Sequence, residues 1–178
     1  MLAELTAVNW WARLRGREPA WRVLHSVPLG DGQGRIRGDV DHLMVGPPGV
    51  VTINSKHHRG GRLALHGEQL VLNGHPTAYV QKARREADRV RHLLAAALAV
   101  CHPELLERAT VRSMIAIVGG RLLVTAWAPG VTVVKTSQLI HALTSLPARL
   151  DPDEVDRVHE LARRSTTWNP PGAPITDR

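Results

Sequence analysis

Four polar side chains stand at the ends of two otherwise apolar segments of this 178-residue chain. Asp39 and Asp41 open the first segment, and Asn54 and Lys56 come near the end of the second. Carboxylate and amide oxygens are typical ligands of hard divalent cations, and a lysine ammonium group can offset negative charge that builds up in a reaction. An acid, an amide and an ammonium group of this kind could act together on one small polar ligand.

Strand geometry predicts that these side chains meet. Residues 40–45 and 50–56 are rich in β-forming residues, and a Gly-Pro-Pro-Gly turn separates them, which predicts a β-hairpin. Alternate side chains of a strand share one face of the sheet. Antiparallel pairing about the turn then puts Asp41 opposite Asn54 or Lys56, with Cβ atoms roughly 4.5–5.5 Å apart.

The same residues also have an ordinary structural interpretation. An acid that faces a lysine across a sheet can be an exposed ion pair, worth less than about 1 kcal/mol, and Asp39 can be a solubility charge at a strand edge. The lysine content favours a functional site. Lys56 is one of 3 lysines beside 20 arginines, which indicates a position that needs a compact ammonium group rather than a guanidinium.

The rest of the chain predicts an α/β fold around this hairpin. Apolar residues at steps of three and four predict a long helix from Tyr79 to Ala99. Asp151-Pro152-Asp153-Glu154 is typical of a helix start, and this helix should end near Arg164. We expect one domain over residues 1–164 and a loosely attached, proline-containing tail over 165–178. The further predictions are helices over 2–15 and from Thr136 or Ser137 to Leu146, a glycine-rich loop over 30–38, and strands over 21–27, 63–66, 70–72, 111–118, 122–127 and 131–134.

The charge distribution predicts a polyanionic partner. The chain carries 23 basic and 16 acidic residues, a net charge of +7. Residues 1–100 hold 14 of the basic and 8 of the acidic residues, so six of the seven net charges lie there. Nucleic acid or an acidic membrane surface would fit this charge, although the arginine bias of a GC-rich genome would also raise it.

The composition excludes several classes of protein. No apolar run approaches the roughly 18 residues of a membrane span, and neither a secretion signal nor a disulfide framework is indicated, since Cys101 is the only cysteine. A cytoplasmic location is therefore expected. With one tyrosine and no phenylalanine, the chain lacks the aromatic platform of a dedicated single-strand binder. The tryptophans expected in the core are Trp10, Trp11, Trp21 and Trp127.

The hairpin and its neighbours resemble a known family. The run DVDHLMVGPPGVVTINSKHHRGG, the later Leu-Asn-Gly at 72–74 and Gln81 are together similar to the NERD, or nuclease-related, domain of the PD-(D/E)xK nuclease superfamily. The form Thr-Ile-Asn-Ser-Lys-His-His is similar to a version found in actinobacterial proteins. The resemblance covers residues 2–94 well and the later strands more loosely.

This resemblance implies a mixed sheet with a restriction-endonuclease-like αβββαβ core followed by C-terminal helices. It also implies roles for matching positions. Asp41 and Glu4 would bind a divalent metal, Mg²⁺ or Mn²⁺, Lys56 would be the lysine of the (D/E)-x-K signature, and Gln81 would support the site. Asn54 departs from the family, since it stands at the acidic position of the signature and offers the metal an oxygen without a negative charge.

The implied substrate is nucleic acid, most simply DNA. Because Asn54 weakens the acidic signature, two functions stay open: a metal-dependent deoxyribonuclease, and a nuclease-fold protein that binds nucleic acid without cutting it. A protein-interaction module is a third reading. For the basic residues nearest the hairpin, a solvated surface is the alternative to contact with phosphate groups; these residues are His57, Arg59, Arg62, Arg84 and Arg85.

Overall fold

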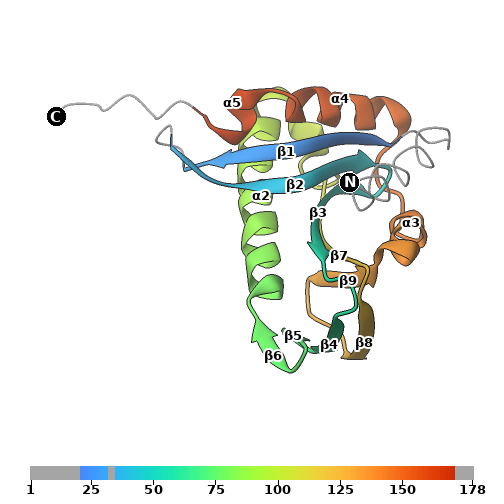
Figure 1. The fold of residues 1–178 in the computed structure, drawn as a ribbon. Coiled ribbons are helices and arrows are strands. Elements are labelled where there is room, and N and C mark those ends of the chain that lie inside the picture. The colour runs from blue at the N-terminus through green and yellow to red at the C-terminus, as the bar shows by residue number, and fades with distance from the viewer. Residues whose placement is uncertain (1–20, 32–34, 171–178) are drawn as a thin grey trace.

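The computed structural model describes residues 21–31 and 35–170, so the helix predicted over 2–15 lies outside it. This part of the chain folds into two sheets and a set of helices (Figure 1). The larger sheet holds β1 (Arg22–Gly30), β2 (Ile36–Gly46), β3 (Gly49–His57), β7 (Val111–Val118) and β9 (Val131–Lys135). The smaller sheet holds β4 (Arg62–His66), β5 (Gln69–Leu72), β6 (His75–Thr77) and β8 (Arg121–Ala126). The helices are α2 (Tyr79–Cys101), α3 (Leu139–Thr144), α4 (Pro152–Ala162) and α5 (Ser165–Trp168), with 3₁₀ turns at Pro103–Leu105 and Thr136–Gln138.

The larger sheet is mixed, which confirms the α/β class. Its strand order is β1-β2-β3-β7-β9. The first three strands are antiparallel, whereas β3, β7 and β9 run parallel to one another. Parallel neighbours need a crossover connection, and between β3 and β7 the chain supplies three strands of the smaller sheet, β4, β5 and β6, followed by α2. The predicted β2–β3 hairpin is confirmed, with Gly46 paired to Gly49 and His42 to Ile53.

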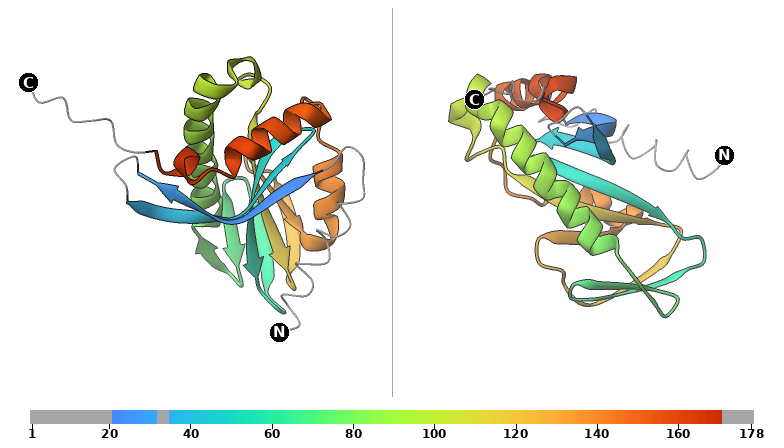
Figure 2. Two further views of the ribbon diagram at one scale, coloured as in Figure 1. Left: turned by 90° about the horizontal axis from the view of Figure 1, so that it is seen from above. Right: turned by 90° about the vertical axis from the view of Figure 1, so that its left-hand side faces the viewer.

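Helices cover both faces of the larger sheet (Figure 2). On one face, Val45 and Val50 of the hairpin pack with Val90 and Leu94 of α2, and α4 and α5 complete this core. On the other face, Val51 and Ile53 pack with α3. The strand residues of β3 thus alternate between α2 and α3, as the period of a strand requires. This alternation decides which side chains of β3 face α2.

The smaller sheet closes the lower end of α2. Leu63 of β4 and Leu70 of β5 pack with Val80 and Ala83 of α2 and with Ile117 of β7. Its opposite face is open to solvent. Among the described residues, no helix is both long and apolar enough to cross a membrane.

Some elements differ from their predicted bounds. β1 extends to Gly30 and β2 begins at Ile36, within the predicted loop, because these strands pair through backbone hydrogen bonds up to Gly30 and Ile36. Trp21 is buried as predicted, but the prediction that Trp127 belongs to the core is wrong, since this residue is 67% exposed. Residues 165–168 form α5 and Trp168 is buried, its indole N–H donating to the Ala162 carbonyl. The packed structure therefore passes the boundary expected at residue 164.

One stability prediction arises from α4. Its N-cap, Asp151, accepts from the Glu154 backbone N–H at 2.8 Å, and the buried Glu154 carboxylate accepts from Arg108 Nη1. The change Arg108→Met removes the only cation paired with this acid among the described residues. We expect a loss of about 2–3 kcal/mol in the free energy of unfolding, below the value for a fully buried pair because Arg108 is half exposed.

Urea denaturation measures this loss. A matched control is Arg163→Met, because Arg163 pairs with Glu160 at 2.9 Å but both side chains are exposed. That change should cost less than about 1 kcal/mol. Equal losses in the two variants would contradict the structural role assigned to the Arg108–Glu154 pair.

Candidate active site

The hairpin divides at the level of Asp41. After the His42–Ile53 pair, β2 stays paired with β1 as far as Gly30, whereas β3 stays paired with β7 as far as His57 (Figure 1). Backbone groups at such a fork lose their hydrogen-bond partner on the opposite strand. The Asp41 side chain replaces the partner of the Ser55 backbone N–H, which donates to Asp41 Oδ2 at 2.8 Å. The carboxylate is therefore held at the point where the strands separate.

Asn54 lies beside this fork and faces α2. The side chain is only 4% exposed. Its Nδ2 donates to the carboxylate of Glu86 on α2, and its Oδ1 accepts from Lys56 Nζ at 3.2 Å. The cation on one side and the carboxylate on the other fix the orientation of the amide. A neutral amide thus links an ammonium group to a largely buried carboxylate.

Lys56 is held by the start of α2. Its ammonium group lies 5.5 Å from the centroid of the Tyr79 ring, within range of a cation–π interaction. The His58 ring stacks on the same tyrosine, with centroids 5.7 Å apart. These contacts, with the hydrogen bond to Asn54, hold a half-buried lysine in one place beside the buried amide.

Glu86 is the third charged member of the cluster. Its carboxylate accepts from Asn54 and lies 3.7 Å from Lys82 Nζ, with the side chain only 12% exposed. Glu86 thus brings to the amide of Asn54 the negative charge that this residue lacks. We call Asp41, Asn54, Lys56 and Glu86 the hairpin cluster.

The donors of the hairpin cluster suit a hard cation. The carboxylates of Asp41 and Glu86 and the amide oxygen of Asn54 are oxygen ligands of the kind Mg²⁺ takes. Within residues 21–31 and 35–170, no group of three or more His, Cys, Asp or Glu side chains could hold a metal ion. Mg²⁺ is commonly bound through one or two carboxylates together with substrate phosphates and water. An ion that arrives with a phosphate ligand would need only one or two of these oxygens from the protein.

His42 lies next to Asp41 in sequence but belongs to a different contact. Its Nδ1 is 2.8 Å from Nδ1 of His25, its partner on β1. Burial lowers the pKa of His42 from 6.5 to about 4; the neighbouring His25 acts in the same direction, and Asp41 opposes both. His42 is therefore neutral at pH 7 and adds no positive charge beside Asp41.

Glu4 and Gln81 are the remaining residues predicted for the site. Glu4 falls outside the described residues. Gln81 is exposed in the first turn of α2 and makes no side-chain hydrogen bond within the described chain. At 100° per residue, it is rotated by about 140° from Glu86 around the helix. The supporting role of Gln81 stays a prediction, as does the metal-binding role of Glu4.

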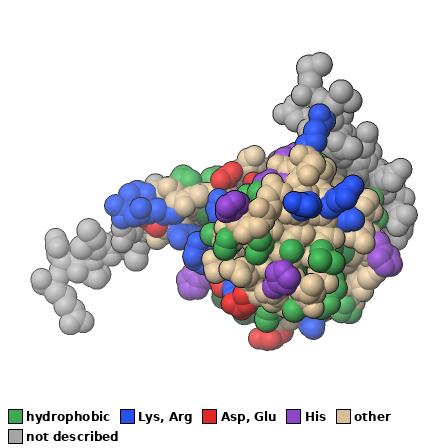
Figure 3. All heavy atoms as spheres, turned by 60° about the horizontal axis from the view of Figure 1, so that its bottom comes forward, with side chains coloured by type: hydrophobic (Ala, Val, Ile, Leu, Met, Phe, Trp, Pro, Cys, Tyr) green, Lys and Arg blue, Asp and Glu red, His purple; other side chains and the backbone are tan. Residues whose placement is uncertain are grey.

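The five predicted nucleic-acid contacts divide by location. His57 and Arg59 are exposed at the end of β3 and in the following turn, and Arg85 is exposed on α2 beside Glu86. Arg84 points elsewhere, since it pairs with Glu68 at 2.9 Å and donates to the Pro129 carbonyl at 2.8 Å. Arg62 lies on the open face of the smaller sheet, where Figure 3 shows apolar and basic side chains on one surface.

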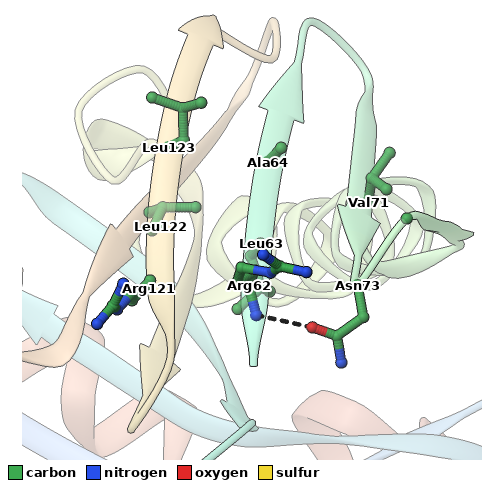
Figure 4. A pocket seen from close by; sticks show the side chains of 9 residues that line it. Arg62, Leu63, Ala64, Val71, Asn73, Arg121, Leu122 and Leu123 are labelled. Carbon is green, nitrogen blue, oxygen red and sulfur yellow. Dashed lines mark hydrogen bonds between the residues drawn. The ribbon is translucent and has the colours of Figure 1, made fainter. Parts of the chain in front are cut away.

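That open face contains a hollow of about 480 Å³. Ala64, Val71 and Leu123 form apolar walls, and Arg62 and Arg121 lie together at one end (Figure 4). Its lining includes no acid, histidine, cysteine or serine. The hollow therefore lacks the groups for acid–base or metal chemistry, and the hairpin cluster is the candidate active site.

Sequence reasoning did not identify Tyr79, Lys82 or Glu86 as site residues. These residues follow one another at intervals of three and four, so they share one face of α2. Glu86 was also an acid within a strongly basic stretch, QKARREADR. A helical projection of α2 would have placed Glu86 beside the buried stripe of Ala83 and Ala87, although only the packing of α2 on β3 shows its contact with Asn54.

The structure is that of a mixed α/β protein in which a forked hairpin presents an acid, an amide and a lysine to a long helix. The family model described as "Nuclease-related domain", NERD, matches residues 2–118. This match covers more than half of the chain, and the protein belongs to the NERD family. The comparisons with curated proteins and with solved structures found no match.

Proposed function

We propose that this protein hydrolyses phosphodiester bonds of DNA at the hairpin cluster, with the help of Mg²⁺ or Mn²⁺. The observation that supports this most strongly is the chain of contacts from Lys56 through Asn54 to Glu86, beside the Asp41 carboxylate at the fork. Structural ion pairs of a sheet do not require a buried amide between the charges. Membership of the NERD family supports the general assignment.

Asp41, Glu86 and the amide oxygen of Asn54 would hold the metal ion, with Glu4 as a further carboxylate. The Asn54 oxygen has two lone pairs, so its bond to Lys56 leaves one available. When bound, such an ion neutralises charge on phosphoryl oxygens and lowers the pKa of a coordinated water. Asp39 lies on the same strand but is exposed and lines the neighbouring pocket, so it has no ligand role in this proposal.

The side chains of the protein account for the remaining requirements of the reaction. The Lys56 ammonium is positioned to offset negative charge that develops on the phosphoryl group. Asn54 and Tyr79 limit the motion of Lys56, and the Ser55 N–H limits that of Asp41. Groups fixed in this way do not have to reorganise as charge develops.

Purified protein tests this proposal. It should nick supercoiled plasmid in the presence of Mg²⁺ or Mn²⁺ and stop when EDTA is added. No cleavage with either ion, over a range of metal concentrations and substrates, would overturn the nuclease proposal.

The expected compartment is a reducing cytoplasm, in keeping with the unpaired, exposed Cys101.

A second candidate function is the binding of nucleic acid without cleavage. It is favoured by two features of the site: Asn54 carries no charge, and Glu86 is already engaged by Asn54 and Lys82. Such a protein would bind DNA in a salt-dependent manner. It would not cut DNA in the presence of any metal ion. The two functions therefore separate in the plasmid assay when DNA binding is measured on the same preparation.

Asn54→Asp should strengthen metal binding in either case. The new carboxylate would face Glu86 at hydrogen-bonding distance, and two carboxylates so close attract a cation between them or bind a proton. We expect Mn²⁺ to bind at least about tenfold more tightly, a change of about 1.4 kcal/mol, in a calorimetric titration at pH 7.5. Asn73→Asp, in the exposed turn after β5, is the control and should leave the affinity unchanged. An Asn54→Asp variant with unaltered affinity would contradict the proposed ligand set.

A further inference from the structure

We propose a second phosphate-binding site, in a pocket between α2 and the extended end of β2, which holds a backbone phosphate of the same nucleic-acid strand that lies at the hairpin cluster. This inference rests on the proposed function, since it assumes a nucleic-acid ligand, but it does not require that the ligand is cut. The pocket has a volume of about 400 Å³.

The pocket adjoins the hairpin cluster through a shared residue. Glu86 lines the pocket and also accepts from Asn54. One wall is α2, and the other is the part of β1 and β2 that continues past the fork (Figure 2). A nucleic-acid strand with one phosphate beside Lys56 could thus place another phosphate in this adjoining pocket.

The charges of the lining select an anion. Asp39 and Glu86 are its acids, and its four bases exceed them by two charges. Three bases come from one helix at spacings of three, four and seven residues, so they lie along one side of α2. The bases are Arg37, Lys82, Arg85 and Arg89.

The bases of the pocket are not all occupied by the fold. Arg85 is exposed and forms no ion pair within the described chain. Arg89 donates to the Gly30 carbonyl through Nη2, while its buried Nε has no hydrogen-bond partner there. Arg37 shares Asp31 with Arg35. Guanidinium groups bind phosphate in a bidentate manner, so Arg85, with Arg89 behind it, is the principal contact.

The neighbouring arginines of α2 provide a matched pair of variants. Arg85 faces the pocket, whereas Arg84 is turned toward Glu68 and Pro129. Binding of a fluorescein-labelled duplex of about 15 base pairs is measured by anisotropy in EDTA at several salt concentrations. Arg85→Gln should weaken binding about 5- to 10-fold at low salt and reduce the slope of log K against log salt by about one. Arg84→Gln should change affinity less than about twofold.

The outcomes separate this inference from the nuclease proposal. A wild-type protein that binds the duplex with the Arg85 dependence, but never cuts plasmid, would support the pocket and overturn the nuclease. Conversely, a protein that cuts plasmid, with an Arg85→Gln variant that binds like wild type, would overturn the pocket alone. Equal losses in the Arg84 and Arg85 variants would also overturn it, because a diffuse basic surface would explain them. Absence of any DNA binding would overturn both.

Discussion

Replacing Lys56 with methionine is expected to reduce DNA cleavage about a thousandfold, which is the upper range for loss of one group that stabilises transition-state charge. Methionine preserves most of the volume of the side chain, so the fold should persist. What disappears is the ammonium group that donates to Asn54 at 3.2 Å. Initial rates of plasmid nicking measure the effect, and thermal unfolding checks the fold.

A second lysine of the chain supplies the control variant for Lys56→Met. Lys135, at the end of β9, is one of the two other lysines and lies outside the hairpin cluster. Lys135→Met should therefore keep nearly full activity. If Lys56→Met retained more than about a tenth of the wild-type rate, the ammonium group would contribute less than about 1.4 kcal/mol to the transition state, and the role given to Lys56 would fail.

Replacing Asp41 with asparagine is expected to reduce cleavage at least about a hundredfold and to raise the metal concentration needed for half-maximal rate. The new amide oxygen can still accept from the Ser55 N–H, which Asp41 does at 2.8 Å, so the fork should keep its geometry. The change removes one negative charge from a site that already has an amide at position 54. Too little charge would remain to hold the ion beside the substrate.

Asp39 is the matched control for Asp41. It lies two residues earlier on β2, is exposed, and lines the neighbouring pocket rather than the fork. Asp39→Asn should change the cleavage rate less than about threefold. A larger loss in Asp39→Asn than in Asp41→Asn would show that the metal is held on the pocket side, and would exchange the roles assigned to these two acids.

The sequence predicted the part of the site that depends on local rules. Alternation along a strand and a Gly-Pro-Pro-Gly turn are enough to bring Asp41 level with Asn54, and the structure has this register, with His42 opposite Ile53. Local rules do not predict which side of α2 meets β3. It depends on how a helix and a sheet pack, so Glu86 became visible as a site residue only in the folded chain.

The different directions of Arg84 and Arg85 likewise depend on tertiary packing. Adjacent residues on a helix point about 100° apart, and the sequence offered both as phosphate contacts. The rotation of α2 is set by Val80, Ala83 and Ala87, which are buried against the sheets. This rotation turns Arg84 toward Glu68 and leaves Arg85 beside Glu86. Periodicity predicts that α2 is a helix, but tertiary packing decides which of its charges face the ligand.

The pairing of Asn54 with Glu86 changes the meaning of the departure from the family signature. Taken by itself, asparagine at the acidic position removes a charge from the site. In the folded chain, a carboxylate from α2 lies against that amide and is itself largely buried. The charge is thus present in the cluster but comes from a helix rather than from the strand.

If the hairpin cluster cuts phosphodiester bonds, loss of both its acid at the fork and its lysine must abolish cleavage. Wild-type protein and an Asp41→Asn/Lys56→Met double variant, purified in parallel, are compared in Mn²⁺-dependent nicking of supercoiled plasmid. We expect steady nicking by the wild type and only the background rate in the folded double variant. Equal nicking by both proteins would contradict it, because the activity would then come from another site or from a contaminant.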